Sequence, residues 1–163
     1  MSASVTPIKI SNQEANVAHI SVNARIDYIM RFSKNAVLVI SDESNSYTML
    51  GSQYLGNLPG DHNAAYISIS SKLNDIQVRC RLIEQLFTDS LFDPEEPLAA
   101  MVLKLAKDKS QAISIVVENS HFLSLQLLHE FCQLAEIAGK ANRVVNVLLL
   151  GQEVTGRLIA ENK

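Results

Sequence analysis

Four short, almost uninterrupted apolar runs constrain this chain more than any other feature of its sequence. They are AVLVI (36–40), AYISIS (65–70), AISIVVE (112–118) and VVNVLLL (144–150). Runs of this kind are typical of strands buried on both faces of a parallel sheet. Amphipathic helical patterns fill the intervals, and strands that alternate with helices indicate βαβ units with right-handed crossovers. We therefore expect an α/β fold: a three-layer α/β/α sandwich around a parallel sheet of four, or with one further strand five, strands.

The helical patterns divide the rest of the chain into short segments. Helices are expected near 21–34, around Met49–Leu55, and over about 73–87, 97–108, 123–139 and 153–160. Gly139 suits the left-handed residue that often follows the end of a helix. Residues 1–18 are polar and aperiodic, so we expect a flexible N-terminal arm there. Residues 19–163 contain no second domain boundary and are interpreted as one domain.

Composition excludes several classes of function. The net charge is −3 and no block of Lys and Arg occurs, so nucleic acid is not an expected partner. No stretch approaches the ~18–20 apolar residues of a membrane span, and the N-terminus does not have the pattern of a signal peptide. Cys80 and Cys132 fall in amphipathic helical patterns without metal or disulfide spacing. We expect both to be buried free thiols, which fits a cytoplasmic location.

The turn after the first apolar run has the strand–loop–helix context of a phosphate-binding loop. Such loops read G-x-x-x-x-G-K-[ST], whereas this one reads SDESNSYT, from Ser41 to Thr48. Ser41 and Ser46 occupy the two glycine positions, and Tyr47 occupies the lysine position. Thr48 alone is retained.

Two further segments follow in the order expected of a P-loop ATPase. The third run ends in Glu118 and Asn119, where such enzymes carry an Asp that orders Mg²⁺ and often a Glu that polarises water. Ser120 and His121 then complete a pattern similar to D-x-A-H. The fourth run continues into Gly151 and Gln152, as VVNVLLLGQ.

On these three segments the chain resembles the AAA+ group that includes the ExeA/GspA secretion ATPases and the MshM-like pilus proteins, over about residues 20–160. Within that group it is most similar in pattern to the N-terminal ATPase-like region of DamX-type cell-division proteins. The resemblance implies a P-loop-type sheet in which the four runs are ordered first, fourth, third, second. It also implies a degenerate nucleotide pocket. The positions of this pocket are Ser41, Ser44, Ser46, Tyr47, Thr48, Glu118 and Asn119.

The replacements at this pocket oppose nucleotide binding for separate physical reasons. Tyrosine at position 47 removes the positive charge that contacts the phosphates. Asp42 and Glu43 place two negative charges inside the loop, where no Lys or Arg offsets them. Asn119 cannot act as a general base. We therefore expect no phosphate nest at Ser41–Ser46, no catalytic residue, no metal and no cofactor; the alternative is weak binding of ATP or ADP with Mg²⁺.

The other candidate residues have plainer structural interpretations. Glu118 is equally the polar end of a strand, and His121 suits a helix entry that hydrogen-bonds locally. His19, His62 and His129 lack the spacing of metal ligands. Arg157 is interpreted as a surface residue rather than an arginine finger.

The expected function is that of a non-catalytic scaffold or protein-interaction domain. The DamX resemblance implies a protein partner in the cell-division or envelope machinery and a place at the cytoplasmic face of the inner membrane, as part of a longer tethered protein. The alternative is a weak nucleotide-binding ATPase of secretion, pilus biogenesis or cell division. A third interpretation is an assembly subunit that packs against an active AAA+ partner.

Overall fold

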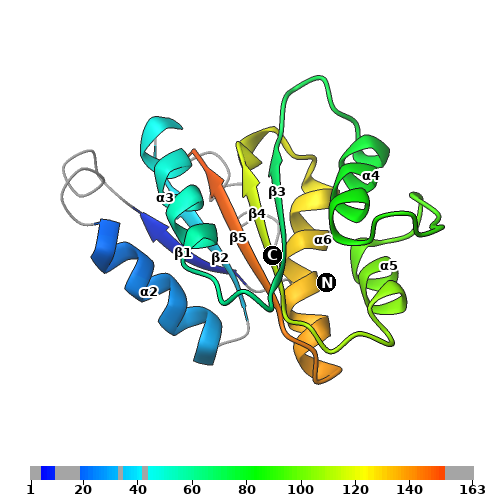
Figure 1. Cartoon of the computed structure of the whole chain (residues 1–163). Coiled ribbons are helices and arrows are strands. Elements are labelled where there is room, and N and C mark those ends of the chain that lie inside the picture. Colours follow the sequence, from blue (N-terminus) through cyan, green and yellow to red (C-terminus); the bar gives the residue numbers. More distant parts are fainter. Residues whose placement is uncertain (1–4, 10–18, 33–34, 42–43, 153–163) are drawn as a thin grey trace.

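A computed structural model describes residues 5–9, 19–32, 35–41 and 44–152 (Figure 1). The described residues form a sheet of five parallel strands in the order β1-β2-β5-β4-β3. The strands are β1 (Val5–Lys9), β2 (Ala36–Ile40), β3 (Asn63–Ser68), β4 (Ile113–Glu118) and β5 (Val145–Gly151). Every residue of β2 is buried, as is every residue of β4 except Glu118. The expected α/β fold with a parallel sheet is confirmed.

The order of the four predicted strands is also confirmed. β2 pairs with β5, β5 with β4, and β4 with β3, so the first apolar run does not pair with the second. The strand that ends in Glu118 is thus one strand removed from β2. This all-parallel arrangement is compatible with Rossmann-like and P-loop-like folds.

The first strand was not predicted, and the expectation of a flexible arm is wrong for residues 5–9. β1 pairs in parallel with β2 over its whole length, from Val5 with Ala36 to Lys9 with Ile40. Ile8 is its single buried residue, at 1% exposed. One buried side chain leaves almost no periodic signal in a sequence. The strand forms because β2 offers an unpaired edge, and the proline at position 7 is tolerated because β1 is an outer strand.

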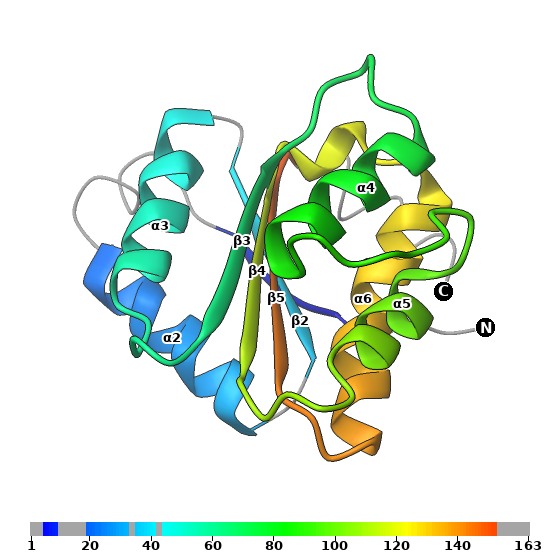
Figure 2. The ribbon, with the colours of Figure 1, turned by 45° about the vertical axis from the view of Figure 1, so that its right-hand side comes forward.

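Helices cover both faces of the sheet (Figures 1 and 2). On one face lie α2 (His19–Phe32) and α3 (Ser44–Gly56), whose buried side chains form an apolar cluster with alternate residues of β2, β4 and β5. On the other face lie α4 (Asp75–Leu86), α5 (Leu98–Leu105) and α6 (Leu125–Lys140), which form a larger cluster. A 3₁₀ helix, η1 (Ser120–Phe122), connects β4 to α6. The three-layer sandwich is therefore as expected.

The two ends of α6 are stabilised by local hydrogen bonds, but the C-terminal end does not use the glycine that the sequence suggested. Ser124 caps α6 by accepting the amide hydrogen of Leu127. The predicted role of Gly139 is wrong, because α6 continues past it to Lys140 and the left-handed residue is Asn142, with φ of 60°. Asparagine tolerates this conformation better than most residues, and its position lets the amide of Arg143 bond to the carbonyl of Ala138.

Several other expectations have clear outcomes. Both cysteines are free; Cys132 is buried, but Cys80 is only half-buried, so its full burial was predicted wrongly. Across the part of the chain that the structure describes, no helix has the length and apolar character needed to cross a bilayer. The expected helix at 153–160, with Arg157, lies outside the described residues.

Candidate functional site

Two positions of the expected degenerate pocket, Thr48 and Glu118, meet at the carboxyl edge of the sheet. Glu118 ends β4 and is half-buried, and Thr48 lies in the second turn of α3 above it. The hydroxyl of Thr48 donates a hydrogen bond of 2.8 Å to Oε1 of Glu118. The hydroxyl of Tyr66, from β3, donates to the other carboxylate oxygen, Oε2. Two residues 70 positions apart, singled out separately in the sequence, are therefore in direct contact.

The remaining positions of the degenerate pocket are only partly described. Ser41 is buried and its amide donates to the carbonyl of Gly151 at 3.0 Å, so this amide extends the β2–β5 pairing. α3 begins at Ser44, which places Ser46 and Tyr47 in its first turn rather than in a loop. Asp42 and Glu43, and the side chains of residues 44–47, lie outside the described part. The prediction of no phosphate nest stays a prediction.

The segment after Glu118 is held by hydrogen bonds to the neighbouring strands β3 and β5. Asn119 has a left-handed backbone, with φ of 60° and ψ of 43°, and its side-chain amide donates to Ser68 at 3.4 Å. Ser120 is fully buried and donates to the carbonyl of Leu150 at 3.1 Å. Burial lowers the pKa of His121, and its Nδ1 has no hydrogen-bond partner among the described residues. The expected local hydrogen bond of His121 is not found at this nitrogen.

The chain already supplies one hydrogen-bond donor to each oxygen of this carboxylate. A P-loop enzyme uses a Ser or Thr and an Asp around Mg²⁺. Thr48 matches the first of these and Glu118 replaces the second, so these two described residues could contribute to a metal site. Both carboxylate oxygens already accept hydrogen bonds from the chain. Among the described residues, no three His, Cys, Asp or Glu side chains gather as potential metal ligands.

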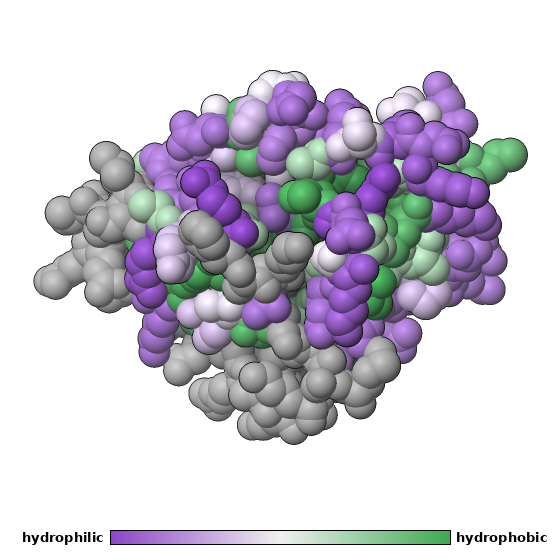
Figure 3. Space-filling model, turned by 90° about the horizontal axis from the view of Figure 1, so that it is seen from below, coloured by the Kyte–Doolittle hydropathy of each residue, from purple (hydrophilic) through white to green (hydrophobic). Residues whose placement is uncertain are grey.

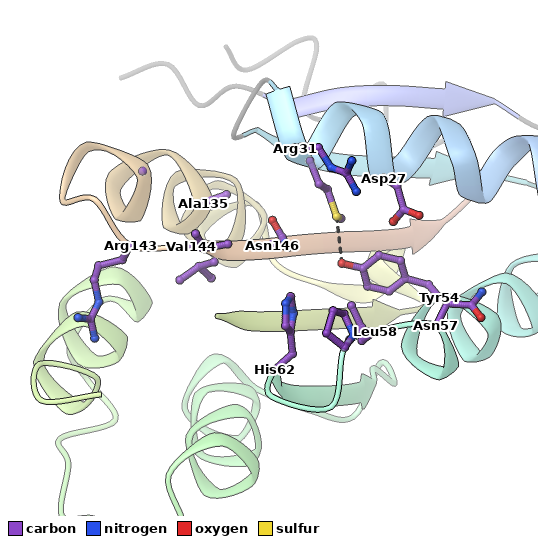
Figure 4. A pocket seen from close by; sticks show the side chains of 14 residues that line it. Asp27, Arg31, Tyr54, Asn57, Leu58, His62, Ala135, Arg143, Val144 and Asn146 are labelled. Carbon is purple, nitrogen blue, oxygen red and sulfur yellow. Dashed lines mark hydrogen bonds between the residues drawn. The ribbon is translucent and has the colours of Figure 1, made fainter. Parts of the chain in front are cut away.

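A second concave region lies at the opposite, amino edge of the sheet. It is a cavity of about 460 Å³ between the ends of α2 and α3 and the start of β5. Figure 3 shows the molecule from this end, where apolar surface is exposed between hydrophilic side chains. In Figure 4, Asp27 and Arg31 approach the cavity from α2, while Leu58 and His62 approach from the turn after α3. Arg143 points away, and its guanidinium donates to the carbonyls of Ala106 and Lys109.

Two polar groups of this cavity, Tyr54 and His62, have side-chain partners. The hydroxyl of Tyr54 donates to the sulfur of Met30 at 3.0 Å, and Nδ1 of His62 lies 3.2 Å from the hydroxyl of Ser114. Ser114 has no exposed surface, so this serine–histidine contact cannot present a nucleophile to a substrate. Ligands of parallel α/β sheets normally bind at the carboxyl edge. The contacts at this cavity therefore support packing rather than catalysis.

Tyr54 makes the stability of the fold sensitive to alkaline pH. Burial raises the pKa of Tyr54 to about 12; hydrogen bonding to Ser114 and Asn146 opposes the rise, and the charge of Asp27 adds to it. Because the pKa is higher in the folded state, this stabilisation is complete below the unfolded value of 10 and is lost as the pH rises toward 12.

We expect Tyr54→Phe to lower the free energy of unfolding by about 1 kcal/mol at pH 8, through loss of the hydroxyl's contacts. At pH 11 the difference from wild type should shrink or change sign. Urea denaturation at both pH values measures this. Tyr28→Phe is the control, because Tyr28 is 66% exposed; an unchanged Tyr54→Phe difference at pH 11 would contradict the assignment.

A buried ion pair was not predicted from the sequence. The guanidinium of Arg79, on α4, contacts both carboxylate oxygens of Glu130, on α6, at 3.1 and 2.6 Å. Glu130 also accepts from the backbone of Leu98 and from Gln126, and Arg79 donates to the carbonyl of Pro94. Both side chains are less than 10% exposed. A charged residue on the buried stripe of each of two helices was the available signal, but nothing in the sequence paired them.

Comparison with known proteins adds no family to this description. No protein-family model matches the chain, and no curated protein is significantly similar to it. The class of protein is therefore defined by the fold: a five-stranded, all-parallel α/β domain with helices on both faces.

Proposed function

We propose that this chain is a non-catalytic interaction domain built on a P-loop-like fold. One observation carries the proposal: the hydroxyls of Thr48 and Tyr66 each donate a hydrogen bond to one oxygen of the Glu118 carboxylate. A carboxylate that orders Mg²⁺ must have an oxygen available for the metal or its water shell. Here a tyrosine from the neighbouring strand takes one oxygen and the retained threonine takes the other.

The neighbouring positions support the same conclusion. Asn119 follows the acid and carries no charge with which to activate water. The turn at 41–48 lacks both glycines and the lysine and includes two acidic residues. A domain with these replacements and a well-packed sheet is suited to presenting surfaces rather than to turnover. On the DamX resemblance we propose a protein partner from the cell-division or envelope machinery, at the cytoplasmic face of the inner membrane.

One observation favours the alternative function, a weak nucleotide-binding ATPase. Thr48 and Glu118 are in contact, and these are the two positions at which a P-loop enzyme holds its Mg²⁺. If the Tyr66 hydroxyl can be displaced, an oxygen of Glu118 becomes available. The two functions therefore differ in whether nucleotide binds at all.

We expect isothermal titration of the wild-type chain with Mg-ATP or Mg-ADP to detect no binding. The sequence of the turn at 41–48 contains no Lys or Arg, and Thr48 and Tyr66 already donate to the Glu118 carboxylate. A dissociation constant tighter than about 100 μM would overturn the proposal. A positive control is a variant that combines five substitutions: Ser41→Gly, Ser46→Gly, Tyr47→Lys, Asp42→Asn and Glu43→Gln. It should gain measurable nucleotide affinity without releasing phosphate, whereas Tyr47→Lys alone should not bind.

A further inference from the structure

β3 is an outer strand with one neighbour. It pairs with β4 over all six of its residues. The amide of Asn63 bonds to Ala112 and that of Ile69 to Glu118, so the odd-numbered residues direct their backbone groups toward β4. In a regular parallel ladder the even-numbered residues direct their backbone N–H and C=O groups away from the paired strand. The amides and carbonyls of Ala64, Tyr66 and Ser68 therefore point out of the sheet.

A side chain of α4 occupies the middle of this outward row. Oε1 of Gln85 accepts the amide hydrogen of Tyr66 at 2.8 Å, and Nε2 of Gln85 donates to the carbonyl of Tyr66 at 3.0 Å. A primary amide carries the same donor and acceptor as a peptide group. Gln85 thus takes the place that a residue of a sixth strand would take. α4 lies beside β3 (Figure 2).

Within the described part of the chain, the rest of the outer edge has no comparable side-chain contact. Exposed strand edges are usually guarded by Lys, Pro, bulges or inward charges. The opposite edge follows this rule, because β1 contains both Pro7 and Lys9. β3 reads NAAYIS, without a charge, a proline or a break in its ladder, and its outward residues Ala64 and Ser68 are small and exposed. Among the described residues, Gln85 is the side chain that hydrogen-bonds to the outward backbone groups of β3.

We propose that Gln85 guards the β3 edge against strand addition, and that the strand it excludes is β3 of a second copy of this chain. The outward row is symmetric about Tyr66. Antiparallel pairing around a two-fold axis at that residue would set Tyr66 against Tyr66, and Ala64 against Ser68 of the other copy. Each pair would exchange two hydrogen bonds, and no like charges would meet. Such a contact is self-complementary and closes as a dimer.

The test replaces Gln85 with alanine and measures mass by light scattering over a concentration series. We expect Gln85→Ala to form a dimer absent from wild type, with half of the chain associated by about 100 μM. Gln133→Ala is the matched control, because it makes the same change on α6 and should leave the mass unchanged. A folded Gln85→Ala chain that keeps the wild-type mass up to that concentration overturns the proposal.

A second variant tests where the association occurs. Adding Ala64→Pro to Gln85→Ala removes one outward amide and places a ring on the edge, which outer strands tolerate. The double variant should return to the wild-type mass, and association that persists would assign the contact to another surface and refute the pairing. A further measurement needs no variant: in wild type, the amide of Tyr66 should exchange with solvent more slowly than those of Ala64 and Ser68. Equal exchange rates would show that Gln85 does not occupy the edge, and would overturn the proposal.

Discussion

Glu130→Ala is expected to lower the free energy of unfolding by about 3–5 kcal/mol, the usual cost of removing one partner of a buried ion pair. The variant leaves the guanidinium of Arg79 buried without its counter-ion, and it removes the acceptor of the Leu98 amide at the start of α5. Urea denaturation followed by circular dichroism measures the change. Glu136→Ala is the control: its pair with Lys140 is partly exposed, at 3.8 Å, and should contribute only about 0.3–0.5 kcal/mol.

Two further measurements separate the ion pair from general packing. The double variant Arg79→Met with Glu130→Leu should lose less stability than Glu130→Ala, since no charge is left unpaired. If it loses more, the contribution of Glu130 is not that of a charge pair. If Glu130→Ala is as stable as Glu136→Ala, the contacts of Glu130 with Arg79 and its neighbours do not stabilise the fold.

The Arg79–Glu130 pair also predicts how the free energy of unfolding changes at low pH. Burial by itself raises the pKa of Glu130, but hydrogen bonds from Arg79, Leu98 and Gln126 outweigh it, so the pKa lies below its ordinary value of 4.5. For a carboxyl with a lowered pKa, the stabilisation is present above the ordinary value and is lost as the pH falls through the folded value. The difference in stability between wild type and Glu130→Ala should therefore narrow below about pH 4.

Gly51→Val is the second substitution with a large expected effect, a loss of about 1–3 kcal/mol from overpacking. Gly51 lies on α3 where the helix approaches the sheet. A Cβ there would lie 2.8 Å from Leu150 and 3.2 Å from Val116, and both side chains are fully buried. Valine adds two further methyl groups to this contact. Chemical denaturation of the purified variant measures the loss.

The matched control uses another glycine of the same helix. Gly56, the last residue of α3, has no atom within 4 Å of its would-be Cβ. Gly56→Val should therefore change stability much less than Gly51→Val. Equal effects of the two substitutions would mean that helix propensity, and not the close approach to the sheet, decides the outcome.

β2, β4 and β5 were readable from the sequence because burial on both faces leaves a continuous apolar run. The bounds of β2 were predicted to the residue, and those of β4 and β5 to within one. The strand order was predicted from the resemblance, because an apolar run does not indicate which other strand it pairs with. Of the three residues that meet at Glu118, the sequence singled out Thr48 and Glu118 but not Tyr66, which was interpreted only as part of a strand.

What the sequence determined by itself is thus the set of elements whose signal is local, namely apolar runs and helical periodicity. The tertiary structure decided the contacts between distant residues. β1 exists because β2 has a free edge, and Arg79 and Glu130 are 51 positions apart before α4 and α6 bring them together. Gly51 is needed only because α3 lies so close to Leu150. Each of these depends on a partner that folding supplies, and no local pattern records it.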